Sequence, residues 1–274
     1  MNPHVMEPPP LARARGANRY RSIVDTASGS FGNVWLGVDR LTDKTVAVKQ
    51  QGMPSAAASR EMAIYRLLAV WPHRHVQRML DSYVTTRGDA LCMVFEFCPQ
   101  TLWSLWKTPL GQQGLLDERL TARLLIGAAS GVEHLHNLDM THGDLSMKNV
   151  LVTEDNVARV CDFGASFCTQ SALCSCQEEI TTRYVRAPEA WFDLPVRGEA
   201  DVWAIGVMAF AMYTGRIYYY YYYYYYYYYY IMREEEKHTR ETYVMRMTTL
   251  VALIRKQLAS HPPSLSKDPV AGQR

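Results

Sequence analysis

Two glycines and a lysine are the first residues along the chain whose types and spacing could bind phosphate. Gly29 and Gly32 lie three residues apart between two predicted strands, where backbone N–H groups can approach phosphate oxygens, and Lys49 follows 17 residues after Gly32. Taken separately, these signals also fit an ordinary hairpin and a solvated lysine at a strand end. Glu61 lies beside Ile64 on the apolar face of a predicted helix. A buried carboxylate needs a cation, and Lys49 is the candidate partner.

The middle of the chain carries three further polar motifs at defined intervals. The segment His142–Asn149 contains a glycine and an aspartate after the histidine, and Asp162-Phe163-Gly164 begins thirteen residues after Asn149. Ala187-Pro188-Glu189 follows. Together with the glycine turn and Lys49, these make five motifs whose order and spacing resemble the eukaryotic protein kinase family. The resemblance covers residues 20 to 217.

The resemblance implies a site that binds ATP and Mg²⁺ and transfers the γ-phosphoryl group to a protein hydroxyl. It implies that Lys49, ion-paired with Glu61, contacts the α- and β-phosphates, and that Asp144 is the catalytic base. Asn149 and Asp162 are implied as the Mg²⁺ ligands, because Mg²⁺ requires hard oxygen donors. The other nucleotide-binding positions that it implies are Ala27, Ser28, Gly29, Ser30 and Gly32 in the loop, Val34 and Ala47 beside adenine, and Glu96 and Cys98 in the hinge.

Three positions depart from the family pattern. Ala27 replaces the first loop glycine, and Gly143 replaces the arginine that normally pairs with a phosphorylated activation segment. We therefore predict that activity does not depend on that phosphate–arginine contact. Ser146 stands where serine/threonine kinases usually have a lysine. Lys148 is the alternative cation for the γ-phosphate, although it also fits a surface lysine.

The segment before Ala187 bears on acceptor specificity. Residues 181–189 are similar to those of the cyclin-dependent and MAP kinase-like group, with Thr182 as the threonine typical of serine/threonine kinases and Arg186 as that group's arginine. The sequence therefore favours a protein serine/threonine kinase over a tyrosine kinase. The alternative is a pseudokinase or truncated kinase that serves as a scaffold without turnover. The three departures favour that alternative, and the intact charged residues favour the kinase.

The strands and helices that the sequence predicts around these residues indicate an α+β, two-lobed kinase-like fold. A small antiparallel β-rich lobe with one helix precedes a mainly helical lobe, which the sequence leaves incomplete. The resemblance implies that Asp201, at the start of an apolar helix, anchors the catalytic-loop backbone; Asp201 also fits a helix cap, and the two roles are compatible. The predicted strands are 33–38, 45–49, 76–84, 91–97, 150–152 and 157–160. The predicted helices are 116–136, 201–213 and a helix that Ser55 caps, which carries Glu61, Ile64, Leu67 and Leu68 on one face. The family's inter-lobe hydrophobic column is assigned to Tyr65, Met79, His142 and Phe163, beside the gatekeeper Phe95.

Thirteen of the 19 tyrosines form one run, which divides the C-terminal part of the chain. Homopolymeric tyrosine has high β propensity and no charge, so an exposed run is an aggregation hazard. We expect the run and the residues after it to come from a gene-model error, with a genuine helical tail or an unstable chain as alternatives. The expected domains are a Pro/Arg-rich tail at 1–19, the N-terminal lobe and hinge at 20–98, a partial C-terminal lobe at 99–217, the run at 218–230 and a tail at 231–274 with a possible helix at 233–260.

Composition limits the compartment and the partners. The chain has 29 basic and 27 acidic residues and is 48% hydrophobic, which argues against generic nucleic-acid binding and against disorder throughout. The six cysteines lack a C-x-x-C pair and read as reduced intracellular thiols. The N-terminus lacks an apolar signal segment, and the longest apolar run, residues 202–213, is too short for a bilayer. We therefore expect a cytoplasmic or nuclear protein that acts on protein substrates, without nucleic acid or membrane, and no motif indicates a regulatory subunit.

Overall fold

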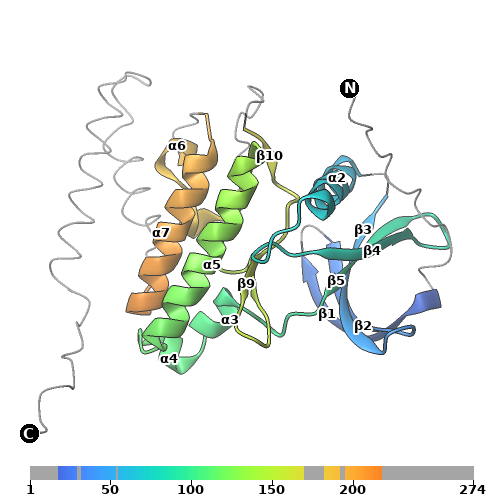
Figure 1. Cartoon of the computed structure of the whole chain (residues 1–274), viewed down its shortest axis with the longest axis horizontal. Coiled ribbons are helices and arrows are strands. Elements are labelled where there is room, and N and C mark those ends of the chain that lie inside the picture. Colours follow the sequence, from blue (N-terminus) through green and yellow to red (C-terminus); the bar gives the residue numbers. More distant parts are fainter. Residues whose placement is uncertain (1–17, 30–31, 54, 170–181, 192–194, 218–274) are drawn as a thin grey trace, which may run out of the picture.

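The structure is a computed structural model that describes residues 18–29, 32–53, 55–169, 182–191 and 195–217. Figure 1 shows a β-sheet with one helix, α2, at one end of the molecule and a group of helices at the other. The α+β architecture predicted from the sequence, with an antiparallel N-terminal sheet followed by helices, is confirmed. The tyrosine run, the possible helix at 233–260 and Ser30 lie outside the described residues.

The N-terminal sheet has five strands in the order β1-β2-β3-β5-β4, and every neighbouring pair is antiparallel. Both faces of β3 contain buried residues: Val46 and Val48 lie on one face and Lys49 and Gln51 on the other, because successive side chains of a strand point to opposite faces. Arg19, which the sequence analysis assigned to the tail, forms an ion pair with Asp39 at 2.7 Å and so ties the chain to this sheet. The strands are β1 (Tyr20–Gly29), β2 (Gly32–Asp39), β3 (Lys44–Gly52), β4 (Met79–Val84) and β5 (Ala90–Glu96).

Helix α2 (Ala56–Val70) begins directly after Ser55, the predicted cap residue. The Ser55 hydroxyl accepts a hydrogen bond from the N–H of Ala58 at 3.2 Å and so caps the first turn. Its buried face includes Glu61, Tyr65 and Leu68. Leu67, which the sequence analysis placed on that face, is exposed because the apolar residues of α2 surround the helix and leave one apolar edge facing solvent.

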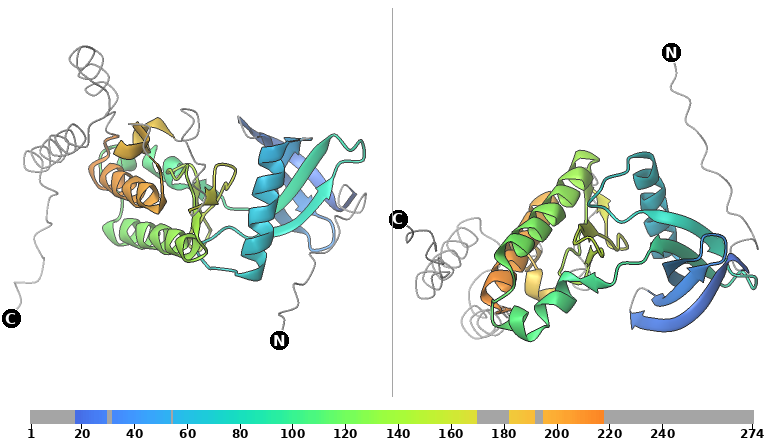
Figure 2. Two further views of the ribbon diagram at one scale, coloured as in Figure 1. Left: turned by 90° about the horizontal axis from the view of Figure 1, so that it is seen from above. Right: turned by 60° about the horizontal axis from the view of Figure 1, so that its bottom comes forward.

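Two long helices organise the C-terminal lobe. Helices α5 (Glu118–Asn137) and α7 (Gly198–Thr214) pack side by side (Figure 2). Helix α7 begins three residues before Asp201 with Arg197 at the cap position, so Asp201 lies inside the first turn and does not cap the helix. Within the described ranges, every helix is too short or too polar to traverse a bilayer. The shorter helices are α3 (Leu102–Trp106), α4 (Pro109–Gln112), α6 (Pro188–Trp191) and the 3-10 turn η1 (Arg183–Val185).

Backbone hydrogen bonds connect the lobes, and two small sheets lie in the C-terminal lobe. The loop after α2 joins strand β9, because the N–H of Gln77 donates to the carbonyl of Val160 and the N–H of Val160 donates to the carbonyl of His75, both at 2.9 Å. One hydrophobic cluster extends from Tyr65 on α2 to Met208 on α7. The small sheets comprise β6 (Gln100–Thr101), β8 (Val150–Val152) and β9 (Ala158–Val160), and the pair β7 (Met140–Thr141) and β10 (Phe167–Cys168).

Candidate active site

Three charged residues from separate elements meet between the lobes. The Lys49 ammonium on β3 donates to both carboxylate oxygens of Glu61 on α2 and to Oδ1 of Asp162, each at 2.8 Å. The Glu61 side chain is fully buried, whereas the Asp162 side chain is 30% exposed. Burial alone would lower the pKa of Lys49, but the carboxylates of Asp162 and Glu61 outweigh burial and raise it. Lys49 is therefore a permanent cation that links β3, α2 and the segment after β9.

The glycine turn lies next to Lys49 in the sheet. Ala27 and Ser28 on β1 pair with Val34 and Asn33 on β2, and Gly29 pairs with Gly32 at the end of the hairpin. Val34 in turn lies opposite Lys49 in the β2–β3 ladder, and Ala47 lies opposite Phe95. The backbone of this hairpin therefore brings the expected loop residues and adenine-flanking residues together over β3.

The expected hinge follows β5. The carbonyl of Glu96 accepts a hydrogen bond from Nε2 of Gln77 at 2.9 Å, and Gln77 is almost fully buried. Burial raises the pKa of the nearby Cys98 thiol to about 11, so this cysteine is an un-ionised thiol at neutral pH. Sequence reasoning missed Gln77, because a single glutamine outside every motif carries no signal of its own.

Asp144 is fixed by the segment before Ala187. Its Oδ1 accepts hydrogen bonds from the backbone N–H of Thr182 at 2.7 Å and from the Thr182 hydroxyl at 2.8 Å. Burial raises the pKa of Asp144, and the two bonds from Thr182 partly oppose this rise. Nδ2 of Asn149 donates to the Asp144 carbonyl at 2.7 Å, so Oδ1 of Asn149 is the side-chain atom that could bind a metal ion. That oxygen and the part-exposed carboxylate of Asp162 are hard donors that fit Mg²⁺.

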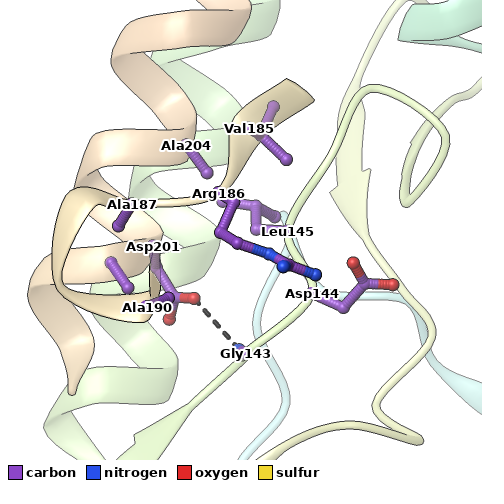
Figure 3. Close-up of a pocket in the computed structure, with 10 residues that line it drawn as sticks. Gly143, Asp144, Leu145, Val185, Arg186, Ala187, Ala190, Asp201 and Ala204 are labelled. Carbon is purple, nitrogen blue, oxygen red and sulfur yellow. Dashed lines mark hydrogen bonds between the residues drawn. The ribbon is translucent and has the colours of Figure 1, made fainter. Parts of the chain in front are cut away.

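Asp201 anchors the backbone of the catalytic loop. Its carboxylate accepts from the N–H of His142 at 2.8 Å, from the N–H of Gly143 at 3.1 Å and from Nε2 of His136 at 2.9 Å. Figure 3 shows the hydrogen bond between Asp201 and Gly143 and the Arg186 side chain extending toward Asp144. Arg186, Gly143 and Asp144 line the same small cavity of about 10 Å³, which has room for about one water molecule.

Gly143 has a backbone conformation that favours glycine. Its φ is +80°, and an added Cβ would lie 2.8 Å from the carbonyl oxygen of Ala165. We expect Gly143→Ala to lower the free energy of unfolding by about 2 kcal/mol through this strain and contact. Urea denaturation measures the loss. The matched control is Gly52→Ala, where an added Cβ meets nothing within 4 Å, and an equal loss in both variants would contradict the strain argument.

The two positions that differ from the family's lysine pattern face different surroundings. Ser146 is fully buried, so it does not reach the open part of the site. Lys148 is exposed, and its Nζ lies 5.5 Å from the ring centroid of Trp103 on α3. Trp103 also stacks on Tyr184, with ring centroids 5.9 Å apart. The structure therefore places Lys148 beside an aromatic pair that the sequence analysis did not identify.

Aromatic rings form a continuous column between the lobes. The Tyr65 ring lies 4.8 Å from that of Phe95 and 5.0 Å from that of Phe163, measured between centroids. The Phe163 ring lies 5.6 Å from that of His142. Met79 packs against the same cluster. The column holds the Asp162 segment against α2, so Asp162 and Glu61 are both within reach of Lys49.

Comparison with known proteins agrees with this geometry. The protein kinase domain family matches residues 20–263 of the chain. Cell division control protein 2 homolog 2 of Trypanosoma brucei brucei is 30% identical over 220 residues, which cover 74% of this chain and 59% of that protein. Cyclin-dependent kinase 4 of Mus musculus is 29% identical over 212 residues, covering 72% and 68%. A mitogen-activated protein kinase of Aspergillus oryzae is 27% identical over 203 residues, covering 73% and 56%. This chain thus spans less than two thirds of the Trypanosoma and Aspergillus proteins.

The family match contains all five motifs and continues past residue 217, where the resemblance seen in the sequence ends. One site of the structure also brings together the glycine turn, the Lys49–Glu61 pair, the catalytic loop and Asp162. The chain therefore belongs to the eukaryotic protein kinase family, near the cyclin-dependent and mitogen-activated group of serine/threonine kinases.

Proposed function

We propose that the protein transfers the γ-phosphoryl group of ATP, in the presence of Mg²⁺, to serine or threonine hydroxyls of other proteins. The observation that carries the proposal is the bridge of Lys49 to both Glu61 and Asp162 at 2.8 Å, because phosphoryl transfer requires the lysine and the metal-binding aspartate to be in place together. Mg²⁺, held by Asn149 and Asp162, would neutralise charge on the phosphates.

Each residue has a separate task in this reaction. Lys49 orients the α- and β-phosphates, and the backbone of the Gly29–Gly32 turn covers them. Asp144 accepts the proton of the acceptor hydroxyl while the new O–P bond forms and the bond to the β–γ bridging oxygen breaks, which releases ADP. Thr182 holds the Asp144 carboxylate in one orientation through its two hydrogen bonds. Lys148, exposed beside the acceptor side of the site, adds positive charge near the transferred group.

The Thr182 contact favours serine and threonine acceptors, as do the names of the relatives. We expect a peptide library with Mg-ATP to be phosphorylated at serine and threonine at least about ten-fold faster than at tyrosine, because a loop fixed close to Asp144 admits the shorter acceptors. Mass spectrometry of the products assigns the acceptor type. Transfer mainly to tyrosine would contradict the specificity and leave the kinase assignment intact.

The rival function is a scaffold that binds partners without turnover. Burial of Ser146 favours it, because this side chain does not replace the missing lysine at the phosphates. Protein that is soluble and binds Mg-ATP but transfers no phosphate to any peptide would support the scaffold over the enzyme.

We also propose that transfer does not require an activation-segment phosphate, since Gly143 has no side chain with which to bind one. Proteins are the proposed partners, and the cytoplasm or nucleus is the proposed location. We also propose that the N-terminal lobe and hinge occupy residues 20–98 and the partial C-terminal lobe residues 99–217, and that residues 218–274 come from a gene-model error. Sequencing the transcript tests that origin, and a spliced message encoding the whole run would contradict it.

A further inference from the structure

Strand β3 carries a second polar side chain on the same face as Lys49. Gln51 lies two residues further along the strand, so its side chain points to the same side of the sheet. It is 7% exposed, and its Nε2 donates to Oε2 of Glu61 at 2.8 Å. The buried carboxylate of Glu61 is thus held from β3 by an ammonium and by an amide.

The donors of Lys49 are fully used in this arrangement. An ammonium has three N–H groups, and those of Lys49 serve the two oxygens of Glu61 and Oδ1 of Asp162. A phosphate that binds Lys49 must therefore take one of these bonds. The bond to Oε2 of Glu61 is the least costly one to give up, because Gln51 already donates to that oxygen.

An apolar side chain at position 51 would remove this alternative. Oε2 of Glu61 would then depend on Lys49 alone, and a buried carboxylate oxygen without a donor is unfavourable. Binding of phosphate by Lys49 would compete directly with retention of Glu61, and hence with the inward position of α2.

We propose that Gln51 is a positioning residue that holds Glu61, and through it α2, while Lys49 binds the nucleotide. This inference rests on the proposed function, because it assumes that Lys49 binds phosphate. Gln51 does not touch the reacting atoms and acts only through Glu61. Strand β3 thereby supplies both Lys49, which binds the nucleotide, and Gln51, which holds Glu61 when Lys49 gives up one of its bonds to that carboxylate.

The test compares Gln51→Leu with Gln50→Leu in the full chain. Gln50 is the preceding residue, half-buried on the opposite face of β3, so the control makes the same change of residue type in the same strand. We expect Gln51→Leu to weaken Mg-ATP binding, measured by calorimetry, by about ten-fold and to raise the KM for ATP but not for the peptide. Gln50→Leu should change neither value by more than about two-fold.

A double-mutant cycle separates positioning from a purely structural role. If Gln51 acts through Glu61, the effect of Gln51→Leu on Mg-ATP affinity should shrink to less than about three-fold in a Glu61→Gln background. Equal affinities for the Gln51 and Gln50 variants, or independent effects in the cycle, would overturn the inference while leaving the proposed function intact. Failure of the wild-type chain to bind Mg-ATP would instead overturn the proposed function. Gln51→Met is the second variant, and if neither variant folds, Gln51 is a structural residue and the inference is wrong.

Discussion

Replacing Asp144 with asparagine is expected to lower kcat for phosphate transfer by about 1000-fold and to leave Mg-ATP affinity nearly unchanged. General-base catalysis contributes about 100- to 10,000-fold, and an amide does not accept the hydroxyl proton. Asparagine keeps the volume of the side chain and retains an oxygen that can accept from Thr182, whose two bonds fix this position. Single-turnover transfer measures the chemical step, and calorimetry measures nucleotide affinity.

The matched control for this prediction is Asp155→Asn. Asp155 is exposed in the turn between β8 and β9, so the same chemical change there should leave kcat within about two-fold. A loss of less than about ten-fold in Asp144→Asn would exclude Asp144 as the base. A comparable loss in both variants would show that the effect does not come from the catalytic loop.

Asp201→Asn is expected to destabilise the C-terminal lobe by about 3 kcal/mol and to abolish most of the activity. The Asp201 carboxylate is 1% exposed and accepts three hydrogen bonds, two of them from the catalytic-loop backbone. An amide turns an NH₂ group toward one set of donors, and hydrogen bonds to charged groups contribute about 1.5–3 kcal/mol each. Thermal and urea unfolding, followed together with transfer activity, measure both effects.

Glu199→Gln provides the comparison on the same helix. Glu199 is exposed in the first turn of α7, so neutralising it removes only a favourable interaction with the helix dipole, about 0.5 kcal/mol. If both variants lose the same stability, the helix terminus and not the loop anchor accounts for the effect of Asp201.

The sequence predicted the charged site because phosphoryl transfer restricts residue type and order so strongly. The sequence paired Lys49 with Glu61 and assigned Asp162 to Mg²⁺, and the structure places a carboxylate oxygen of each at 2.8 Å from the Lys49 ammonium. Gln51 was not identified, because the predicted strand ends at Lys49, whereas β3 continues to Gly52 and places Gln51 on the same face as Lys49. Trp103 was missed because its contacts come from segments 45 and 81 residues away.

The ends of elements were harder to predict than the elements themselves. Asp201 precedes an apolar run and so resembles a helix cap, yet α7 begins at Gly198; the apolar pattern does not reveal this start, because the first turn carries Glu199 and Asp201. The family match reaches residue 263, whereas the motifs end before the tyrosine run. A family model sums weak preferences over many positions, and no single residue beyond 217 carries enough information to be recognised by its chemistry.

The hydrogen bonds between β9 and the loop after α2 determine how a rotation of α2 would move Glu61. Those bonds, through His75, Gln77 and Val160, join the loop after α2 to the helical lobe, so a rotation of the helix relative to that lobe would have its pivot near the C-terminal end of α2. Glu61 lies nine residues from Val70, about 14 Å from the pivot at 1.5 Å per residue. A rotation of roughly 10° therefore moves Glu61 by about 2 Å, which is enough to break its contacts with Lys49 and Gln51. A contact at the N-terminal end of α2, which lies furthest from that pivot, would therefore displace Glu61 with the smallest force.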